Sequence, residues 1–152
     1  MTSDAPRTMT GGCQCRRVRY RVEVADDAAY LCHCGMCRRA TGGVSAALTQ
    51  VSQAAVTWDN GPPDFYRSSP IAERPFCSAC GTPLGFRYVD SDKMDLTVGS
   101  FDEPGWFRPT TNFSDETRLE AWSDTSHLPA MRLDTYAPLV EKWARAGGER
   151  PA

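Results

Sequence analysis

Seven cysteines are the residues of this sequence best suited to chemistry, and they occur in three clusters. The clusters are Cys13-x-Cys15, Cys32-x-Cys34-x-x-Cys37 and Cys77-x-x-Cys80. Such short spacings let several sulfurs approach one ion without straining the chain, because Zn–S bonds are only about 2.3 Å long. Thiolates are soft ligands that favour zinc or iron–sulfur clusters, and the spacings do not match those of ferredoxins. The pattern therefore predicts bound zinc.

The number of cysteines indicates two zinc sites of different kinds. A structural zinc takes four protein ligands, whereas a catalytic zinc commonly has three and keeps one position open. Seven thiols thus divide naturally into one closed and one open site. Spacing permits two divisions. The first joins Cys34 and Cys37 to Cys77 and Cys80 and leaves Cys13, Cys15 and Cys32 over. The second joins Cys13 and Cys15 to Cys77 and Cys80 and leaves Cys32, Cys34 and Cys37 as one compact group. Neither spacing nor composition chooses between them.

An open site with three thiolates would favour sulfur chemistry over the activation of water. Zinc with three thiolates carries net negative charge and is a weak Lewis acid toward water, so a fourth thiol is the better ligand. A free thiol has a pKa of about 8.5, but a thiol bound to zinc loses its proton at neutral pH. A thiolate that adds to an aldehyde forms a hemithioacetal, and the reverse reaction breaks a C–S bond. The open site is therefore a candidate centre for that chemistry.

The composition is that of one ordinary globular domain. The chain has 152 residues, 41% hydrophobic and 24% charged, and its net charge of -2 does not suggest a nucleic-acid-binding protein. No apolar stretch is long enough to span a membrane, and the first ten residues lack the apolar run of a secretion signal. We expect a cytoplasmic, reducing setting in which the cysteines do not form disulfides. No feature indicates a particular oligomeric state.

Alternating hydrophobic patterns predict a mainly β fold with one C-terminal helix. Strands are expected in VRYRVEV (18–24), VSAALTQV (44–51) and KMDLTVGSF (93–101), and a helix in DTYAPLVEKWARAGG (134–148). The last cysteine motif forms a knuckle before FRYV (86–89). Asn60-Gly61 indicates a hairpin between aromatic runs, and DEPGWFRPTTNF (102–113) is typical of a loop. We expect a flexible leader over residues 1–9, a single zinc-binding β domain over 10–146 and a disordered tail over 147–152.

Four segments in this order resemble the glutathione-dependent formaldehyde-activating enzyme family, which also includes centromere protein V. They are GGCQC…VRY, CHCGMCRR…TGG, FCSACGTPL and VGSFDEP, and the resemblance extends from about Gly11 to Pro129. The sequence departs from the family pattern at two places. Arg16 follows the first motif where the family usually has Gly. The stretch RLEAWSD offers Glu120 where the family usually has a histidine and a hydrophobic residue, and the only late histidine is His127.

The resemblance implies a fold, a ligand division and an activity. The implied fold consists of several small coiled antiparallel β-sheets around zinc knuckles, similar to the B-type methionine sulfoxide reductases. The implied division gives a structural zinc to Cys13, Cys15, Cys77 and Cys80 and a catalytic zinc to Cys32, Cys34 and Cys37, hence two zinc ions per chain. The implied activity is that of a carbon–sulfur lyase similar to S-hydroxymethylglutathione synthase, acting on a glutathione or other thiol adduct of formaldehyde or a related aldehyde. An open site with three ligands is expected to lose its zinc readily.

Basic residues beside the middle motif are candidates for substrate binding. Arg38 and Arg39 follow Cys37, and their guanidinium groups suit the two carboxylates of glutathione, although solvated surface charges are an equally good interpretation. His33 or His127 would complete a purely structural Cys₃His site, but in an extended segment His33 points away from its flanking cysteines.

Two other functions stay open on the sequence alone. One is a non-catalytic zinc-binding interaction module. The other is a thiol redox protein in which Cys34 and Cys37 cycle to a disulfide.

Overall fold

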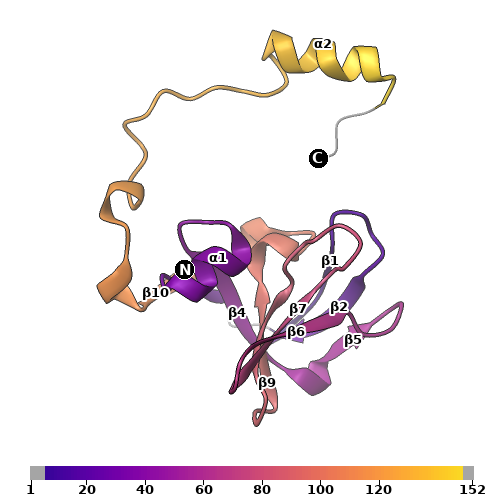
Figure 1. Cartoon of the computed structure of the whole chain (residues 1–152), viewed down its shortest axis with the longest axis vertical. Coiled ribbons are helices and arrows are strands. Elements are labelled where there is room, and N and C mark those ends of the chain that lie inside the picture. Colours follow the sequence, from indigo (N-terminus) through magenta and orange to yellow (C-terminus); the bar gives the residue numbers. More distant parts are fainter. Residues whose placement is uncertain (1–5, 149–152) are drawn as a thin grey trace. The chain divides into compact units, whose positions relative to one another are not determined.

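The chain divides into two compact units in the computed structural model, which describes residues 6–148. The first unit ends at Leu119 and holds all the described strands, while the second begins at Glu120 and contains helix α2 (Ala137–Ala146; Figure 1). The sequence predicted one domain over 10–146, whereas the structure separates the residues after Leu119 from the β unit. Residues 1–5 and 149–152, which belong to the expected leader and tail, lie outside the described residues. Among the described helices, none has the length and apolar character needed to cross a membrane.

A three-stranded antiparallel sheet opens the first unit. Its strands are β1 (Arg7–Gly12), β2 (Arg19–Val24) and β5 (Val56–Trp58), in the order β1-β2-β5. Strand β2 alternates as predicted, with Tyr20, Val22 and Val24 buried and Arg21 exposed. The start of β1 corrects the expected leader, because Met9 is buried in the core and residues 7–9 pair with β2.

The second sheet has seven strands in the order β10-β3-β4-β9-β8-β7-β6. They are β3 (Ala28–Cys32), β4 (Ala46–Ser52), β6 (Asp64–Ser69), β7 (Ala72–Phe76), β8 (Gly85–Tyr88), β9 (Lys93–Thr97) and β10 (Arg108–Phe113). All neighbours pair antiparallel except β10, which runs parallel to β3. Ten described strands in two sheets and a C-terminal helix confirm the predicted mainly β fold.

The two faces of the seven-stranded sheet have different roles. On β9, Met94 and Leu96 point into the hydrophobic core. Asp95 lies between them and therefore on the opposite face, where the register places it opposite Gln50 of β4 and Phe86 of β8. This second face carries the pocket described below.

The segment around Asn60 does not form the predicted hairpin. Strand β5 belongs to the three-stranded sheet and β6 to the seven-stranded one, so the turn at Gly61 (φ 86°) connects two sheets. Pro62 and Pro63 lack the N–H groups that would extend a hairpin ladder across the turn. The aromatic residues on each side therefore pair with different partners.

Residues 108–113, predicted as part of a loop, form the edge strand β10. All six residues are exposed, so the strand has no alternation of buried and exposed positions that a sequence pattern could reveal. Pro109 is tolerated because the pairing with β3 shifts register between Pro109 and Thr111.

A short helix, α1 (Gly35–Thr41), contains the third cysteine of the middle motif and lies against β4. Cys34 caps its start, because its sulfur accepts the backbone N–H of Cys37 at 3.3 Å. Gly42 ends it in the left-handed conformation (φ 73°), which glycine adopts without steric cost. The sequence did not predict this helix, since seven residues are too few for a periodic pattern.

The main core lies around Tyr20, whose side chain is fully buried. Its ring packs edge-on against Trp58 and Phe101, with centroids 5.6 and 5.5 Å apart, and its hydroxyl is hydrogen-bonded to Ser100 at 2.7 Å. Cys13 and Cys77 belong to the same hydrophobic core. Two cysteines, from the first and the last motif, are therefore part of the core.

Candidate metal centres and adjoining pockets

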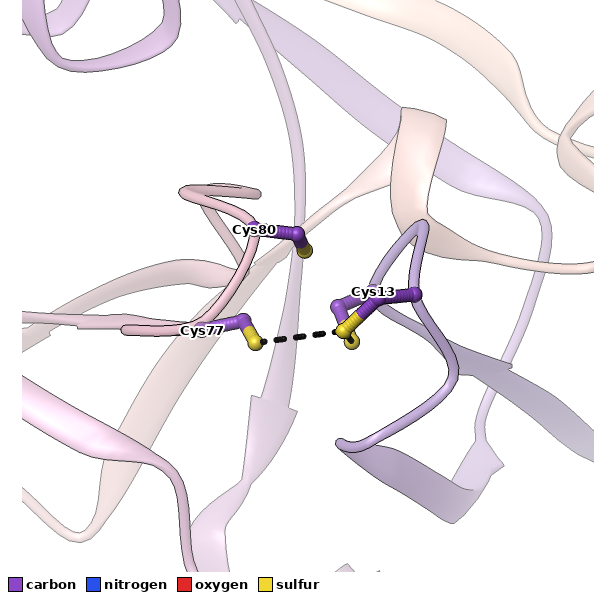
Figure 2. Close-up of side chains that lie close together, drawn as sticks. Cys13, Cys77 and Cys80 are labelled. Carbon is purple, nitrogen blue, oxygen red and sulfur yellow. Dashed lines mark hydrogen bonds between the residues drawn. The ribbon is translucent and has the colours of Figure 1, made fainter.

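The first and last cysteine motifs meet in one group, here called the core cluster: Cys13, Cys15, Cys77 and Cys80. Their four sulfurs all lie within 4.8 Å of one another, with 3.6 Å between Cys13 and Cys15 and 3.8 Å between Cys15 and Cys77. Figure 2 shows Cys77 and Cys80 pointing from one segment toward Cys13 on another. Four mutually adjacent thiols supply a complete tetrahedral donor set for a soft ion such as zinc.

Local backbone geometry holds the core cluster in shape. Gly81 has φ 79°, and its N–H donates to the carbonyl of Cys77 at 2.7 Å, which turns the chain back beneath the two sulfurs. Arg16, which directly follows Cys15, also has a positive φ of 67°. This is the position where the related family usually has glycine, and the conformation gives that preference a physical reason.

Hydrogen-bond donors around the core cluster favour thiolate sulfur. The N–H of Val18 donates to the sulfur of Cys13 at 3.2 Å, and the hydroxyl of Thr82 lies 3.2 Å from the sulfur of Cys80. The Thr82 hydroxyl and backbone lower the pKa of the Cys80 thiol to about 5. A deprotonated cysteine is the form that binds metal, so these contacts suit the donor set.

The middle motif forms a separate group, the pocket cluster: Cys32, Cys34 and Cys37. Cys32 ends β3, Cys34 caps α1 and Cys37 lies in its first turn, so one strand end and one helix start bring the three sulfurs within 4.8 Å of one another. Three local sulfurs leave one position of a tetrahedral ion open. None of the seven cysteines, all within the described residues, forms a disulfide.

A buried arginine contacts the pocket cluster. Arg74 of β7 is only 8% exposed, and its guanidinium donates to the sulfur of Cys37 at 3.5 Å and stacks 5.0 Å from the ring centroid of Phe86. Burial raises the pKa of the Cys37 thiol to about 12, while Arg74 acts in the opposite direction. A positive charge at this point would offset the negative charge that three thiolates give to a bound divalent ion.

His33 lies between two cysteines of the pocket cluster but faces away from them. It is buried, and its Nε2 is hydrogen-bonded to Oδ1 of Asn112 at 2.9 Å. Its carbonyl accepts hydrogen bonds from Arg38 and from the hydroxyl of Thr117 at 2.8 and 3.0 Å. The residue therefore anchors the cysteine segment to β10 and the turn that follows, and its ring is engaged away from the sulfurs. His127 is exposed in the second unit.

A pocket of about 690 Å³, here called the sheet pocket, opens beside the three sulfurs of the pocket cluster. Its floor is the second face of the seven-stranded sheet, so Tyr30 and Cys32 reach it from β3, Leu48 from β4 and Phe86 from β8. Its acidic groups are Asp26 and the deeply buried Asp95, and Arg74 is the guanidinium among its described lining residues. The apolar residues around it also include Met36, Tyr88 and Phe113.

A second pocket of about 460 Å³, the helix pocket, is lined by part of α1. Met36 and Arg74 line both pockets, so the two adjoin each other at the pocket cluster. Arg39 and Arg74 supply two guanidinium groups here, and no carboxyl side chain is among the described residues that line it. The two pockets thus differ in charge.

The structure separates the two candidate substrate arginines. Arg39 is exposed and lines the helix pocket. Arg38 instead donates to the backbone carbonyls of His33 and Thr117 at 2.8 and 2.9 Å and lines neither pocket.

Sequence reasoning missed Arg74, Asp95 and Tyr30 as parts of the site. Asp95 occupies the polar position of an alternating strand, which normally faces solvent, yet it is 6% exposed beneath the sheet pocket. Arg74 stands three residues before Cys77, on the strand that ends at the core cluster. The pairing of β7 with β8 brings Arg74 to the pocket cluster, and no local sequence motif indicates that pairing.

Comparisons with known proteins give one matching family, one related sequence and one crystal structure of similar fold. The profile of the family described as glutathione-dependent formaldehyde-activating enzyme matches residues 8–116. A protein of Schizosaccharomyces pombe named an uncharacterized lyase is 31% identical over 80 residues, which is 53% of this chain and 58% of that protein. A crystal structure of a Rhodobacter sphaeroides protein, 21% identical, matches with a TM-score of 0.55 and covers 70% of this chain and 100% of the other. That last likeness concerns the fold alone.

Proposed function

Because the chain belongs to the glutathione-dependent formaldehyde-activating enzyme family, we propose that it is a zinc-dependent carbon–sulfur lyase. Its substrate would be the adduct of glutathione, or a similar thiol, with formaldehyde or a related aldehyde. The observation that supports this most is the pocket cluster, whose three sulfurs with one position open line a pocket that can hold a ligand. Family membership supports a lyase at a coarser level, and the fission yeast relative is also named a lyase.

We propose different roles for the two cysteine clusters. The core cluster fits a structural zinc, because four sulfurs complete a tetrahedral donor set at the edge of the hydrophobic core, to which Cys13 and Cys77 belong. The pocket cluster fits a catalytic zinc, which when bound would hold the substrate thiol as a thiolate. Two zinc ions per chain follow from this division.

The proposed reaction moves one bond and one proton. In the lyase direction the C–S bond of the hemithioacetal breaks, the electron pair stays on sulfur and the hydroxyl proton leaves as the carbonyl forms. The synthetic direction reverses each step, and neither direction needs an oxidant or a reductant. Arg74 would stabilise the negative charge that develops on sulfur beside Cys37.

The thiol partner is proposed from the charge of the helix pocket. Glutathione carries two carboxylates, and guanidinium groups bind carboxylates well. Arg39 lines that pocket, whereas Arg38 is held by two backbone carbonyls. We keep both residues as proposed substrate contacts and expect Arg39 to contribute more. A reducing, cytoplasmic setting is proposed with this substrate.

Glutathione affinity of the zinc-loaded protein tests this assignment. Arg39→Ala is expected to weaken binding about tenfold, because a charge-assisted hydrogen bond contributes about 1.5 kcal/mol or more. Arg38→Ala should have a smaller effect, and Arg21→Ala, a change at an exposed arginine of β2, should have none. Calorimetric titration gives the affinities. Unchanged affinity in Arg38→Ala, in Arg39→Ala and in the double variant would contradict the assignment.

A further inference from the structure

We infer that the sheet pocket receives the aldehyde half of the substrate and that this half has an apolar body at least the size of a benzene ring. The inference rests on the proposed lyase function and deepens it by assigning a substrate class. The aldehyde would thus be a larger one than formaldehyde. Glutathione, or a thiol like it, would extend along the helix pocket on the other side of the shared residues Met36 and Arg74.

The first argument is size and lining. A one-carbon aldehyde needs almost no space beside the sulfurs, yet the sheet pocket has about 690 Å³, within the range of pockets that bind whole small molecules. Its walls include the side chains of Tyr30, Leu48, Phe86 and Phe113. Tyr30 and Phe113 pack with ring centroids 6.3 Å apart, and Phe86 is fixed by its stacking with Arg74. Such a surface gains free energy when an apolar group covers it.

The second argument is charge, which decides which half of the adduct enters which pocket. Arg74, the guanidinium of the sheet pocket, already donates to the sulfur of Cys37. The carboxyl groups that line this pocket, Asp26 and Asp95, offer no positive charge to a carboxylate. The helix pocket has one guanidinium that the sheet pocket lacks, that of Arg39, and no carboxyl side chain is among its described lining residues. A thiol bearing carboxylates is therefore better placed in the helix pocket, which leaves the sheet pocket to the carbonyl component.

The third argument is position. Cys32, Cys34 and Cys37 all line the sheet pocket, and none of them lines the helix pocket. The carbon attached to a sulfur bound at this cluster would therefore face the sheet pocket, and any substituent on that carbon would extend along the aromatic walls. In a hemithioacetal this substituent is the body of the aldehyde.

A binding experiment measures the contribution of the aldehyde half of the adduct without any turnover. S-benzylglutathione and S-methylglutathione differ only by the ring, and they are titrated into zinc-loaded wild-type protein. We expect the benzyl compound to bind about 30-fold more tightly, as burial of one ring of apolar surface predicts. Equal affinities would overturn the inference.

A pocket-filling variant shows where the ring lies. Thr111 is exposed on β10, opposite Tyr30, and lines the sheet pocket. Thr111→Trp should reduce the benzyl preference about tenfold by occupying the space of the ring. Thr57→Trp, the same change at an exposed position of β5 outside both pockets, should leave it unchanged. A benzyl preference that survives Thr111→Trp would place the ring elsewhere and overturn the inference.

Turnover distinguishes failure of the inference from failure of the proposed function. Hemithioacetal formation from glutathione and benzaldehyde is compared with that from glutathione and formaldehyde, with Cys37→Ser as the inactive reference. The inference expects a higher kcat/KM for benzaldehyde. A higher value for formaldehyde, lost in Cys37→Ser, would overturn the inference and leave the lyase standing. Rates with both aldehydes no faster than those of Cys37→Ser, together with no glutathione binding, would overturn both.

Discussion

The two cysteine clusters use the same ligand atoms but differ in what adjoins them. The core cluster joins segments more than 60 residues apart and is continuous with the hydrophobic core through Cys13 and Cys77. The pocket cluster comes from six consecutive residues and stands at the wall of a pocket, with a buried arginine against one sulfur. A cluster that closes a long loop stabilises a fold, whereas a local cluster with an open side is free to bind a ligand. The setting of the sulfurs, more than their number, therefore distinguishes the proposed roles.

The largest difference between the two clusters, in both stability and activity, is expected from one matched pair of cysteine substitutions. Cys77 and Cys37 are 1% and 5% exposed, so burial alone does not distinguish them. Cys77→Ser should destabilise the protein by about 4 kcal/mol or more, because loss of a structural metal is lost folding energy. The Tm should then fall by about 10 °C. Cys37→Ser should abolish the proposed lyase activity with a Tm change of only a few degrees. Calorimetry of both variants checks this, and equal losses of Tm would remove the contrast between the clusters.

A substitution at Arg74 tests whether its positive charge supports the pocket cluster. Arg74→Met keeps much of the side-chain volume but removes the charge next to Cys37. We expect activity or affinity for the second zinc to fall about 10- to 100-fold, as is usual when a partner of a metal ligand is lost. Arg87→Met is the matched control, because Arg87 also stacks on a ring, that of Phe65 at 3.9 Å, but lines neither pocket. Equal activity losses in the two variants would indicate a general packing effect.

The smallest expected effect concerns the backbone of the core cluster. Arg16 holds a left-handed conformation at φ 67°, whereas the turn after the pocket cluster uses Gly42 for the same purpose. Arg16→Gly should raise the free energy of unfolding by about 0.5 kcal/mol, since the strain relieved slightly exceeds the entropy that glycine adds to the unfolded chain. Arg17→Gly, at a position without positive φ, should lower it. Chemical denaturation measures both, and a loss of stability in Arg16→Gly would refute the strain argument.

Sequence patterns predicted the elements and motifs that depend on local residue spacing. They did not predict the contacts that depend on how the strands pair. The alternation of β2 and the helical spacing around Trp143 were sufficient to predict those elements, and both are present. The cysteine motifs identified all seven candidate ligands, but spacing allowed two divisions. The structure brings Cys13 and Cys15 to Cys77 and Cys80, and the N–H of Gln14 donates to the hydroxyl of Thr82 at 3.1 Å between the two turns.

The pocket could not be predicted in this way. Asp95 and Arg74 reach one surface only because β7, β8 and β9 lie side by side in the sheet. A buried carboxyl and a buried guanidinium have the same sequence pattern as exposed ones on an alternating strand. The edge strand β10, which supplies Thr111 and Phe113 to the pocket, has no hydrophobic alternation at all.

The most direct test of two independent metal centres is the zinc content per chain. It is measured on anaerobically purified wild-type protein, on Cys37→Ser and on the variant that combines Cys37→Ser with Cys77→Ser, by elemental analysis of protein of known concentration. The account predicts two zinc ions in the wild type and one in Cys37→Ser, with the remaining ion lost in a variant that combines both substitutions. One zinc ion in the wild type and one in Cys37→Ser would show that the pocket cluster does not hold metal, which would contradict the proposed catalytic centre.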